Sequence, residues 1–328
     1  ELKRGVDPRL AELRAATGAN ELVGAEGGFL VQSDHASFMF DAAKDSGVIA
    51  PLCTTVPMSS NSISMNLLDE SSLVDGQQFG GVSAQWRAEA GSVTASKPKF
   101  YPAQIRLNAL DALYYATEEQ LEDAANLGFM ASNAFNSVIG WKLDDSLING
   151  NGAGKPLGIL NSDALIQVAK ESGQAADTIE YLNVDKMVDR LQVGCELGAK
   201  WFIHASLGQQ LRNCVKVGTN TDFMLYVPPG GISGSQYASL YGYPVRRLQQ
   251  CKAPGDLGDI LLADFSKYLL FKKTGIKASQ SAHVAFLTSE MVFKWSIRVA
   301  GQPAHRTAIT DANGGVTRSP FVSLAERA

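Results

Sequence analysis

The chain has 328 residues, of which 45% are hydrophobic and 19% charged. This balance is typical of a globular protein, and the length predicts two domains or one domain with large excursions. Lys and Arg total 29 and Asp and Glu total 33, so the net charge of −4 excludes a bulk electrostatic attraction to nucleic acid. The sequence contains no apolar run long enough for a membrane-spanning helix.

The cysteines and histidines do not form a recognisable metal motif. Four cysteines lie far apart, in apolar surroundings and without a Cys-x-x-Cys pair: Cys53, Cys195, Cys214 and Cys251. This pattern predicts small buried side chains in a reducing cytoplasm. The four histidines are scattered, without the spacing of a metal site. We therefore expect no metal and no cofactor.

The N-terminal part predicts two extended features. Residues 1–50 hold a short amphipathic helix followed by several glycines, so we expect an arm that does not pack as a domain. In the stretch from Asn61 to Leu110, residues 62–67 and 105–109 alternate between polar and apolar side chains and predict half-buried strands. The polar residues between them predict a two-stranded hairpin arm, which is unstable by itself and needs a neighbouring surface.

A long helix is predicted over residues 117–148. Thr117 and Gln120 form a capping box, and the helix stops at Asn149-Gly150. The acidic residues of its first turns complement the positive end of the helix dipole: Glu118, Glu119, Glu122 and Asp123. Asp144 and Asp145 diverge on adjacent helix positions, so we expect them on a solvated face.

From about residue 157 onward the pattern becomes mixed α/β. Residues 183–200 predict a helix, and Ser206 is the expected N-cap of a second helix that ends at Val215. The predicted strands are residues 201–205, 244–248, 260–263, 268–272 and 291–299. The last of these carries one apolar face.

Two segments resemble catalytic motifs, and we interpret both structurally. The run from Gly150 to Lys155 follows a helix and continues with Pro156. A phosphate-binding loop would instead follow a strand, and it would have Ser or Thr at the position of Pro156. It predicts a helix stop and turn. His204 and Ser206 could form a base and a nucleophile, but Ser206 is the expected helix cap. A hydrolase is therefore a remote alternative, and we expect no enzyme.

The ordered series of arm, hairpin, long helix, α/β domain and long strand resembles the tailed-phage major capsid proteins of the Hong Kong 97-type fold. Four groups of segments carry the local resemblance: residues 84–89 with 96–100, DDSLINGNGAGKPLGIL at 144–160, residues 199–203 with 240–245, and residues 260–277 with the strand that follows to Pro303-Ala304. The resemblance extends from about Phe29 to Asp311.

This resemblance implies an α+β Hong Kong 97-like capsid fold. Its parts would be an N-terminal arm (1–50), a peripheral domain (51–68 and 100–155) with the spine helix (117–148), an extended β-hairpin loop (69–99), an axial α/β domain (156–276), a long strand returning to the peripheral domain (277–303) and a C-terminal segment in the axial domain (304–328). The family's leader is often removed during maturation, which is compatible with a chain that begins at Glu1.

The implied function is a virion shell protein, assembled in the bacterial host cytoplasm into hexamers and pentamers around double-stranded DNA, without sequence-specific binding. Portal, scaffold or maturation protease, and a cement protein would be its partners. The extended loop would contact a neighbouring subunit through Trp86, Arg87, Glu89, Lys97 and Lys99. Some members join subunits covalently from Lys to Asn, but residues 284–299 contain no Asn, which predicts non-covalent contacts. An encapsulin-like nanocompartment shares the fold and is the alternative.

Overall fold

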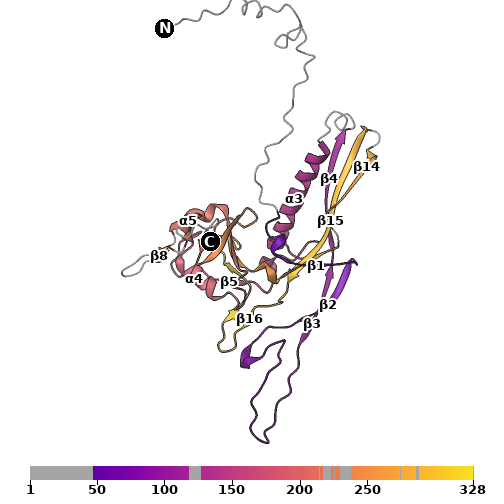
Figure 1. The fold of residues 1–328 in the computed structure, drawn as a ribbon. Coiled ribbons are helices and arrows are strands. Elements are labelled where there is room, and N and C mark those ends of the chain that lie inside the picture. Colours follow the sequence, from indigo (N-terminus) through magenta and orange to yellow (C-terminus); the bar gives the residue numbers. More distant parts are fainter. Residues whose placement is uncertain are drawn as a thin grey trace, which may run out of the picture. The chain divides into compact units, whose positions relative to one another are not determined.

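The computed structural model describes residues 47–117, 127–213, 215–216, 223–224, 226–229, 238–273, 275–285 and 288–327. Within these residues, two larger sheets and three short two-stranded ladders account for the strands (Figure 1). The predicted helix at 6–16, most of the predicted 1–50 arm, and Cys214 lie outside the described residues.

The first sheet is built around one long strand, β15 (Glu290–Pro303). Its other strands are β1 (Thr54–Pro57), β4 (Asn108–Thr117), β13 (Tyr268–Lys272) and β14 (Lys277–Ala285). Both β4 and β14 pair with the first part of β15, and β13 pairs with its end. β15 confirms the predicted strand at 291–299 and is longer at both ends.

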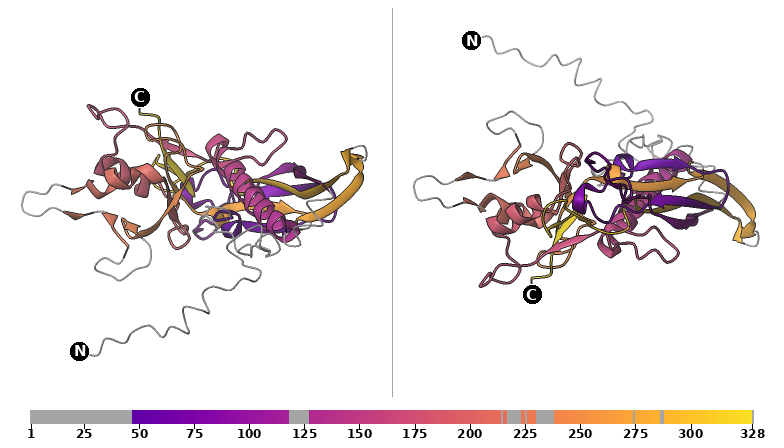
Figure 2. Two further views of the ribbon diagram at one scale, coloured as in Figure 1. Left: turned by 90° about the horizontal axis from the view of Figure 1, so that it is seen from above. Right: turned by 90° about the horizontal axis from the view of Figure 1, so that it is seen from below.

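Helix α3 (Leu127–Asn149) packs on the first sheet (Figure 2). The alternating side chains of β15 supply the contact, because Trp295 stacks on Phe135 of α3 with ring centroids 4.4 Å apart. The predicted helix stop is confirmed at Asn149. Gly150 is needed there, since a Cβ would lie 2.1 Å from the carbonyl oxygen of Pro156.

The second sheet is mixed and has seven strands. In spatial order they are β5 (Ile166–Val168), β18 (Phe321–Leu324), β12 (Ile260–Ala263), β6 (Lys200–His204), β11 (Tyr243–Leu248), β10 (Ser239–Leu240) and β9 (Tyr226–Val227). Strands β6, β11, β12 and β13 confirm predictions from the alternation and apolar runs. A buried cluster that includes Trp201, Ile260 and Val322 lies within this part of the chain.

The short helices differ from the prediction. Helix α4 (Tyr181–Asp189) ends about ten residues before the expected end at residue 200. The residues that follow it pair with Ser319 instead. The Ser319 amide donates to the Arg190 carbonyl and the Gln192 amide donates to the Ser319 carbonyl, both at 3.0 Å. The single-turn helix η6 (Ala205–Leu207) and α5 (Gly208–Asn213) follow β6. His204, and not Ser206, is the N-cap of η6, since its side chain accepts from the Ser206 amide.

The remaining elements are short. They are the ladders β2 (Ser62–Leu68) with β3 (Phe100–Arg106), β7 (Val215–Lys216) with β8 (Phe223–Met224), and β16 (Ile309–Thr310) with β17 (Thr317–Arg318), and the single-turn helices η3 (Ala50–Leu52), η4 (Val74–Gly76), η5 (Ile159–Asn161) and η7 (Phe265–Lys267).

The predicted strand at 105–109 spans two strands, because the chain changes partner at Leu107. β3 pairs with β2, whereas β4 pairs with β15. At the junction, the amide of Leu107 donates to the carbonyl of Asn61 at 2.9 Å, and its side chain is buried beside Phe271. The predicted two-stranded arm over 61–110 is thus wrong beyond its base: the ladder ends at Leu68 and Phe100, and residues 69–99 have only isolated bridges and one helical turn.

Candidate assembly surfaces

Residues 69–99, hereafter the 69–99 loop, project from the β2–β3 ladder (Figure 1). Hydrogen bonds of 2.9 to 3.5 Å join its two legs: Asp69 to Lys99, Lys99 to Gly80, Ser83 to Ser96, and Thr94 to Gln85. The two residues of each hydrogen-bonded pair are closer in sequence with each step, and the last pair is Gln85 with Thr94. Residues 86–93, which lie between them, therefore form the tip. The loop is hairpin-shaped, although its legs do not form regular strands.

Large apolar side chains of the 69–99 loop are exposed to solvent. Trp86 is 104% exposed, Phe79 62% and Val93 56%. An exposed aromatic of this size on a segment without its own core is typical of a contact surface. Burying it would stabilise a complex by roughly 1.5–3 kcal/mol for a large apolar side chain.

The five predicted contact residues fall in two places on the 69–99 loop. Trp86, Arg87 and Glu89 lie at the tip, and all three are exposed. Lys97 and Lys99 lie on the returning leg, where both side chains are also exposed and the backbone of Lys99 holds the legs together. The predicted acidic helix start, with Glu118, Glu119, Glu122 and Asp123, lies outside the described residues.

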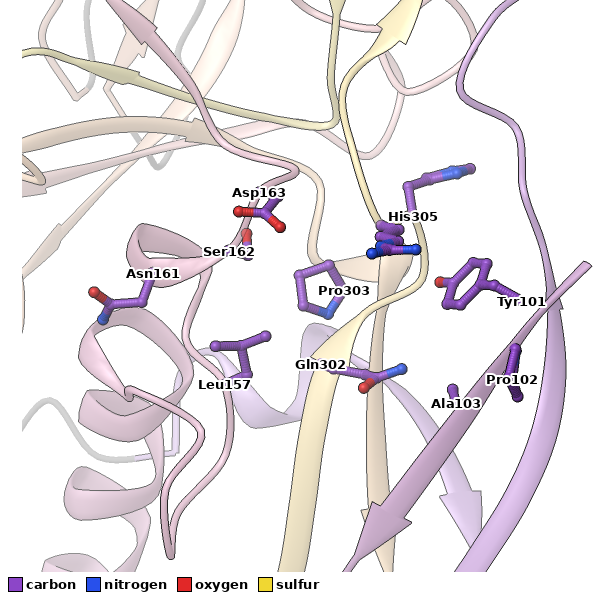
Figure 3. A pocket seen from close by; sticks show the side chains of 11 residues that line it. Tyr101, Pro102, Ala103, Leu157, Asn161, Ser162, Asp163, Gln302, Pro303 and His305 are labelled. Atoms are coloured by element: carbon purple, nitrogen blue, oxygen red, sulfur yellow. The ribbon is translucent and has the colours of Figure 1, made fainter.

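A cavity of about 470 Å³, hereafter the root pocket, lies where the 69–99 loop joins the rest of the chain (Figure 3). Three segments line it: Tyr101 to Ala103 of β3, Leu157 with 161–163, and Gln302 with Pro303, His305 and Arg306 at the end of β15. In Figure 3 the Tyr101 ring faces Pro303 and His305, and Leu157 lies on the opposite side of the pocket. The pocket combines apolar walls with an acid, Asp163, and a base, Arg306, both exposed.

The walls of the root pocket are held in place by contacts across the chain. The Tyr101 hydroxyl donates to the carbonyl of Ala304 at 3.3 Å, and the Arg306 guanidinium lies 5.9 Å from the centre of the Tyr101 ring. Burial lowers the pKa of His305, while Glu70 raises it and Lys267 lowers it. Burial also raises the pKa of Tyr101. The pocket therefore combines an aromatic ring and prolines with polar side chains, including Asn161 and Gln302.

The prediction that Asp144 lies on a solvated face of the helix is wrong. Its side chain is fully buried on α3 and accepts hydrogen bonds from the amides of Val48, Ile49 and Ala50 at 2.7, 3.2 and 3.0 Å. Burial raises its pKa, and these amides lower it. The carboxylate therefore holds residues 48–50 against α3. Asp145, by contrast, pairs with Lys142 at 3.0 Å and is partly exposed.

The His204 and Ser206 pair has hydrogen-bonding geometry, with 2.7 Å between His204 Nδ1 and Ser206 Oγ. The same nitrogen accepts the Ser206 amide at 3.3 Å, which is the capping contact of η6. A catalytic pair also needs a group that orients the imidazole. Among the described residues, the imidazole of His204 forms hydrogen bonds with Ser206 alone.

The part of the chain that the structure describes offers no metal site and no reactive thiol at its surface. It has no cluster of three or more His, Cys, Asp and Glu side chains that could hold a metal ion. Cys53, Cys195 and Cys251 are buried free thiols, as predicted. No described helix combines the length and apolar character needed to cross a membrane. Within the described residues, the exposed loop tip and the root pocket are the strongest candidates for function.

Comparisons with known proteins agree with a structural role. The model of the phage capsid family matches residues 27–313. Among solved structures, the capsid of a native GTA particle has 18% identity and a TM-score of 0.69, covering 94% of this chain and 99% of its own. A Microbacterium phage Oxtober96 chain has 17% identity and a TM-score of 0.63, covering 93% and 99%.

An encapsulin also shares the fold. The SrpI encapsulin of Synechococcus elongatus PCC 7942 has 10% identity and a TM-score of 0.59, covering 93% of this chain and 96% of its own. None of the curated protein sequences compared with the chain matches it. The structural likenesses establish a mixed helix-and-sheet capsid fold, and the family model covers most of the chain. The chain therefore belongs to the phage capsid family, and it is a structural protein that forms a capsid shell as a component of the virion.

Proposed function

We propose that this chain is the major capsid protein of a tailed double-stranded DNA phage, with a Hong Kong 97-type fold. Copies assemble into hexamers and pentamers, which form an icosahedral or elongated head. The observation that carries this proposal is the 69–99 loop, with Trp86 fully exposed at its tip. A loop with this much exposed apolar surface gains stability only against another molecule, and a shell supplies a neighbouring copy on every side.

One buried cluster lies within the proposed axial domain and the C-terminal segment, whereas another joins both proposed domains, including Leu143 and Phe202. The cluster around Trp201 and Val322 supports an axial domain over 156–276, joined by the C-terminal segment 304–328. The stacking of Phe135 on Trp295 supports a peripheral domain in which α3 is part of the spine helix. The predicted single strand over 277–303 is wrong, because this segment forms two antiparallel strands, β14 and β15. The extended loop is 69–99, and residues 1–50 are the N-terminal arm.

The shell encloses the DNA as a container, without sequence-specific binding. A chain with net charge −4 also has little general attraction for phosphates. Assembly takes place in the bacterial host cytoplasm, and the partners are a portal, a scaffold or maturation protease, and a cement protein. Subunits are held by non-covalent contacts. Lys97 and Lys99 are exposed, but β15 offers no Asn in residues 290–299.

The test is to express the full chain in bacteria and examine it by negative-stain microscopy and by size-exclusion chromatography. Rings or closed shells are expected from the parent chain. Removal of residues 77–95, which takes away the tip and leaves the β2–β3 ladder, should leave a folded subunit that cannot close a shell. A matched control removes residues 313–315, which are exposed in the turn between β16 and β17, and should assemble as the parent does.

Two results would contradict the proposal. A parent chain that remains a monomer at every concentration and salt would exclude a shell-forming role. Normal shells from the 77–95 deletion would show that the loop is not the contact that closes the shell. Circular dichroism of each variant establishes that it has folded.

An encapsulin-like nanocompartment is the second candidate, and the likeness to the SrpI encapsulin favours it. The contents of particles purified from the native source separate the two. Nuclease-protected double-stranded DNA is expected for a phage head, whereas an encapsulated protein without DNA would identify a nanocompartment.

A further inference from the structure

The chain contains three Asn-Gly pairs, which are Asn149-Gly150, Asn151-Gly152 and Asn313-Gly314. An Asn-Gly pair is chemically labile, because glycine has no side chain to keep its amide nitrogen away from the Asn amide carbon. Attack of that nitrogen on that carbon needs an Asn side chain and a glycine amide that other groups do not hold. The structure places the three pairs in three different environments, and these environments decide which pair can react.

The first pair is held on both sides of the reaction. The Asn149 side-chain amide donates to Asp145 Oδ1 and to the Gln250 carbonyl, both at 2.9 Å. The Gly150 amide donates to the Ser146 carbonyl at 3.0 Å, and Gly150 is buried. Attack of Gly150 on Asn149 therefore requires these hydrogen bonds at the end of α3 to open first.

The second pair is exposed but restrained. The Asn151 side-chain oxygen accepts from the Ala153 amide at 3.2 Å, in a turn that Asn commonly forms with the backbone two residues on. The Asn151 backbone also bridges to Leu157, and Gly152 has a φ of 77°. These contacts restrain both the side chain and the backbone, although solvent reaches them.

The third pair lacks both restraints. Asn313 and Gly314 are exposed in the turn between β16 and β17, and the Asn313 side chain forms no hydrogen bond with any described residue. The Gly314 carbonyl accepts from the Val316 amide at 2.6 Å, whereas the Gly314 amide donates to no described residue. The turn is closed beneath them, because the Asp311 amide donates to the Val316 carbonyl at 3.0 Å. Both reacting groups are therefore free within a turn whose ends are fixed.

Glycine at position 314 is not required by the fold. A Cβ built on Gly314 would meet no atom beyond its chain neighbours within 4 Å, and its φ lies outside the left-handed region. By contrast, a Cβ on Gly150 would lie 2.1 Å from the Pro156 carbonyl oxygen, and the φ of Gly152 favours glycine. What glycine supplies at position 314 is the absence of a side chain beside Asn313, which leaves the Asn amide carbon open to attack.

We propose that Asn313 is a site of spontaneous deamidation in this protein. The Gly314 amide nitrogen loses its proton and forms a bond to Asn313 Cγ, and the Cγ–Nδ2 bond breaks so that ammonia leaves with that proton. Water then opens the resulting cyclic imide at either of its carbonyls. The products are aspartate and isoaspartate, and each modified copy carries one negative charge more than the parent net charge of −4.

The turn keeps its base when Asn313 is modified. Arg318 Nε lies 2.7 Å from Asp311 Oδ2, and β16 remains paired with β17. These contacts do not use the Asn313 side chain, so the subunit stays folded while it becomes more acidic. The reaction needs only the folded subunit and water. A chain that never assembles into shells would therefore overturn the proposed function and leave this inference standing.

The first experiment compares the three pairs within one molecule. The full chain is incubated at mildly alkaline pH and digested, and fragmentation mass spectrometry measures the loss of each Asn amide. Asn313 should react at least about tenfold faster than Asn149, because the hydrogen bonds of Asn149 and Gly150 must open before attack, and Asn151 should lie between them. The same incubation in urea removes the fold and should bring the three rates together. Equal rates in the folded chain, or a faster Asn149, would overturn the proposal.

The second experiment tests the attack by Gly314. Gly314→Ala should slow the reaction at Asn313 several-fold, because a side chain restricts the backbone conformations that bring the nitrogen to the amide carbon. Gly315→Ala is the matched control, since a Cβ there also meets nothing within 4 Å, and it should leave the rate unchanged. Circular dichroism establishes that both variants have folded. Equal rates for the two variants would contradict the role of Gly314.

Isoelectric focusing gives a second readout on the intact chain. A more acidic band should accumulate with time in the parent and not in Asn313→Gln, because the longer side chain does not form the same ring readily. Asn313→Asp should focus at the position of the acidic band from the beginning. An acidic band that accumulates equally fast in Asn313→Gln would show that the charge arises at another residue, and the proposal would be wrong.

Discussion

Arg327 and Asp259 form a completely buried ion pair that joins the segment after β18 to the residues before β12. The contact is reinforced by the backbone, since the Gly255 amide donates to Asp259 Oδ2 at 3.0 Å and the Arg327 amide donates to the Gly255 carbonyl at 2.8 Å. If one of these two charges is removed, the other remains buried without a partner, which destabilises the fold.

We predict that Arg327→Met destabilises the unassembled subunit by about 3–5 kcal/mol, because it leaves the Asp259 carboxylate buried without its partner. Urea unfolding followed by Trp fluorescence measures this change. The double variant Arg327→Met with Asp259→Leu removes both charges and should recover much of the loss. A single variant as stable as the parent would show that the pair contributes nothing.

Asp144→Asn should destabilise the subunit by about 1–3 kcal/mol. An amide offers one acceptor where the carboxylate has two, so at least one of the amides of Val48, Ile49 and Ala50 would face an NH₂ group. Asp145→Asn is the matched control on the next helix position, and it should change the free energy of unfolding by less than about 1 kcal/mol, as an exposed pair does. Equal effects of the two substitutions would contradict the capping role of Asp144.

His305 predicts a dependence of stability on pH. Burial lowers its pKa in the folded chain below the ordinary 6.5, so between these two values the unfolded chain binds more protons. The contribution of His305 to stability is therefore complete above pH 6.5 and is lost as the pH falls below it. Chemical denaturation from pH 5 to pH 8 tests this, and His305→Gln should reduce the slope.

The three described cysteines should be unreactive in the folded subunit. Burial raises the pKa of Cys53 and Cys251 to about 12 and that of Cys195 to about 11, so the nucleophilic thiolate is scarce at pH 8. A Cys214→Ser variant treated with an aromatic disulfide should release colour only when urea is added. Rapid reaction of the native variant would show that one of these sites opens.

Local patterns determined a large part of this protein. Alternation of apolar and polar side chains predicted β15, and a short apolar run predicted β6, which is buried at its three central residues. The stop at Asn149-Gly150 was also predictable, since it depends on residues adjacent in the chain. The polar 69–99 stretch was recognisable as a projecting segment from its composition, whereas the contact role of Trp86 was implied by the resemblance to a known family.

Only the tertiary structure decided the features that depend on distant partners. Ser319 ends α4 by pairing with residues 190–192, and Asn61 ends the β2–β3 ladder by accepting the Leu107 amide. Asp144 is buried because residues 48–50 present three amides to it, about 95 positions away along the chain. The root pocket assembles Tyr101, Asp163 and Pro303 from three separate segments. Periodicity describes which face of an element is apolar, whereas the identity of the group that meets that face is set by packing between segments far apart in sequence.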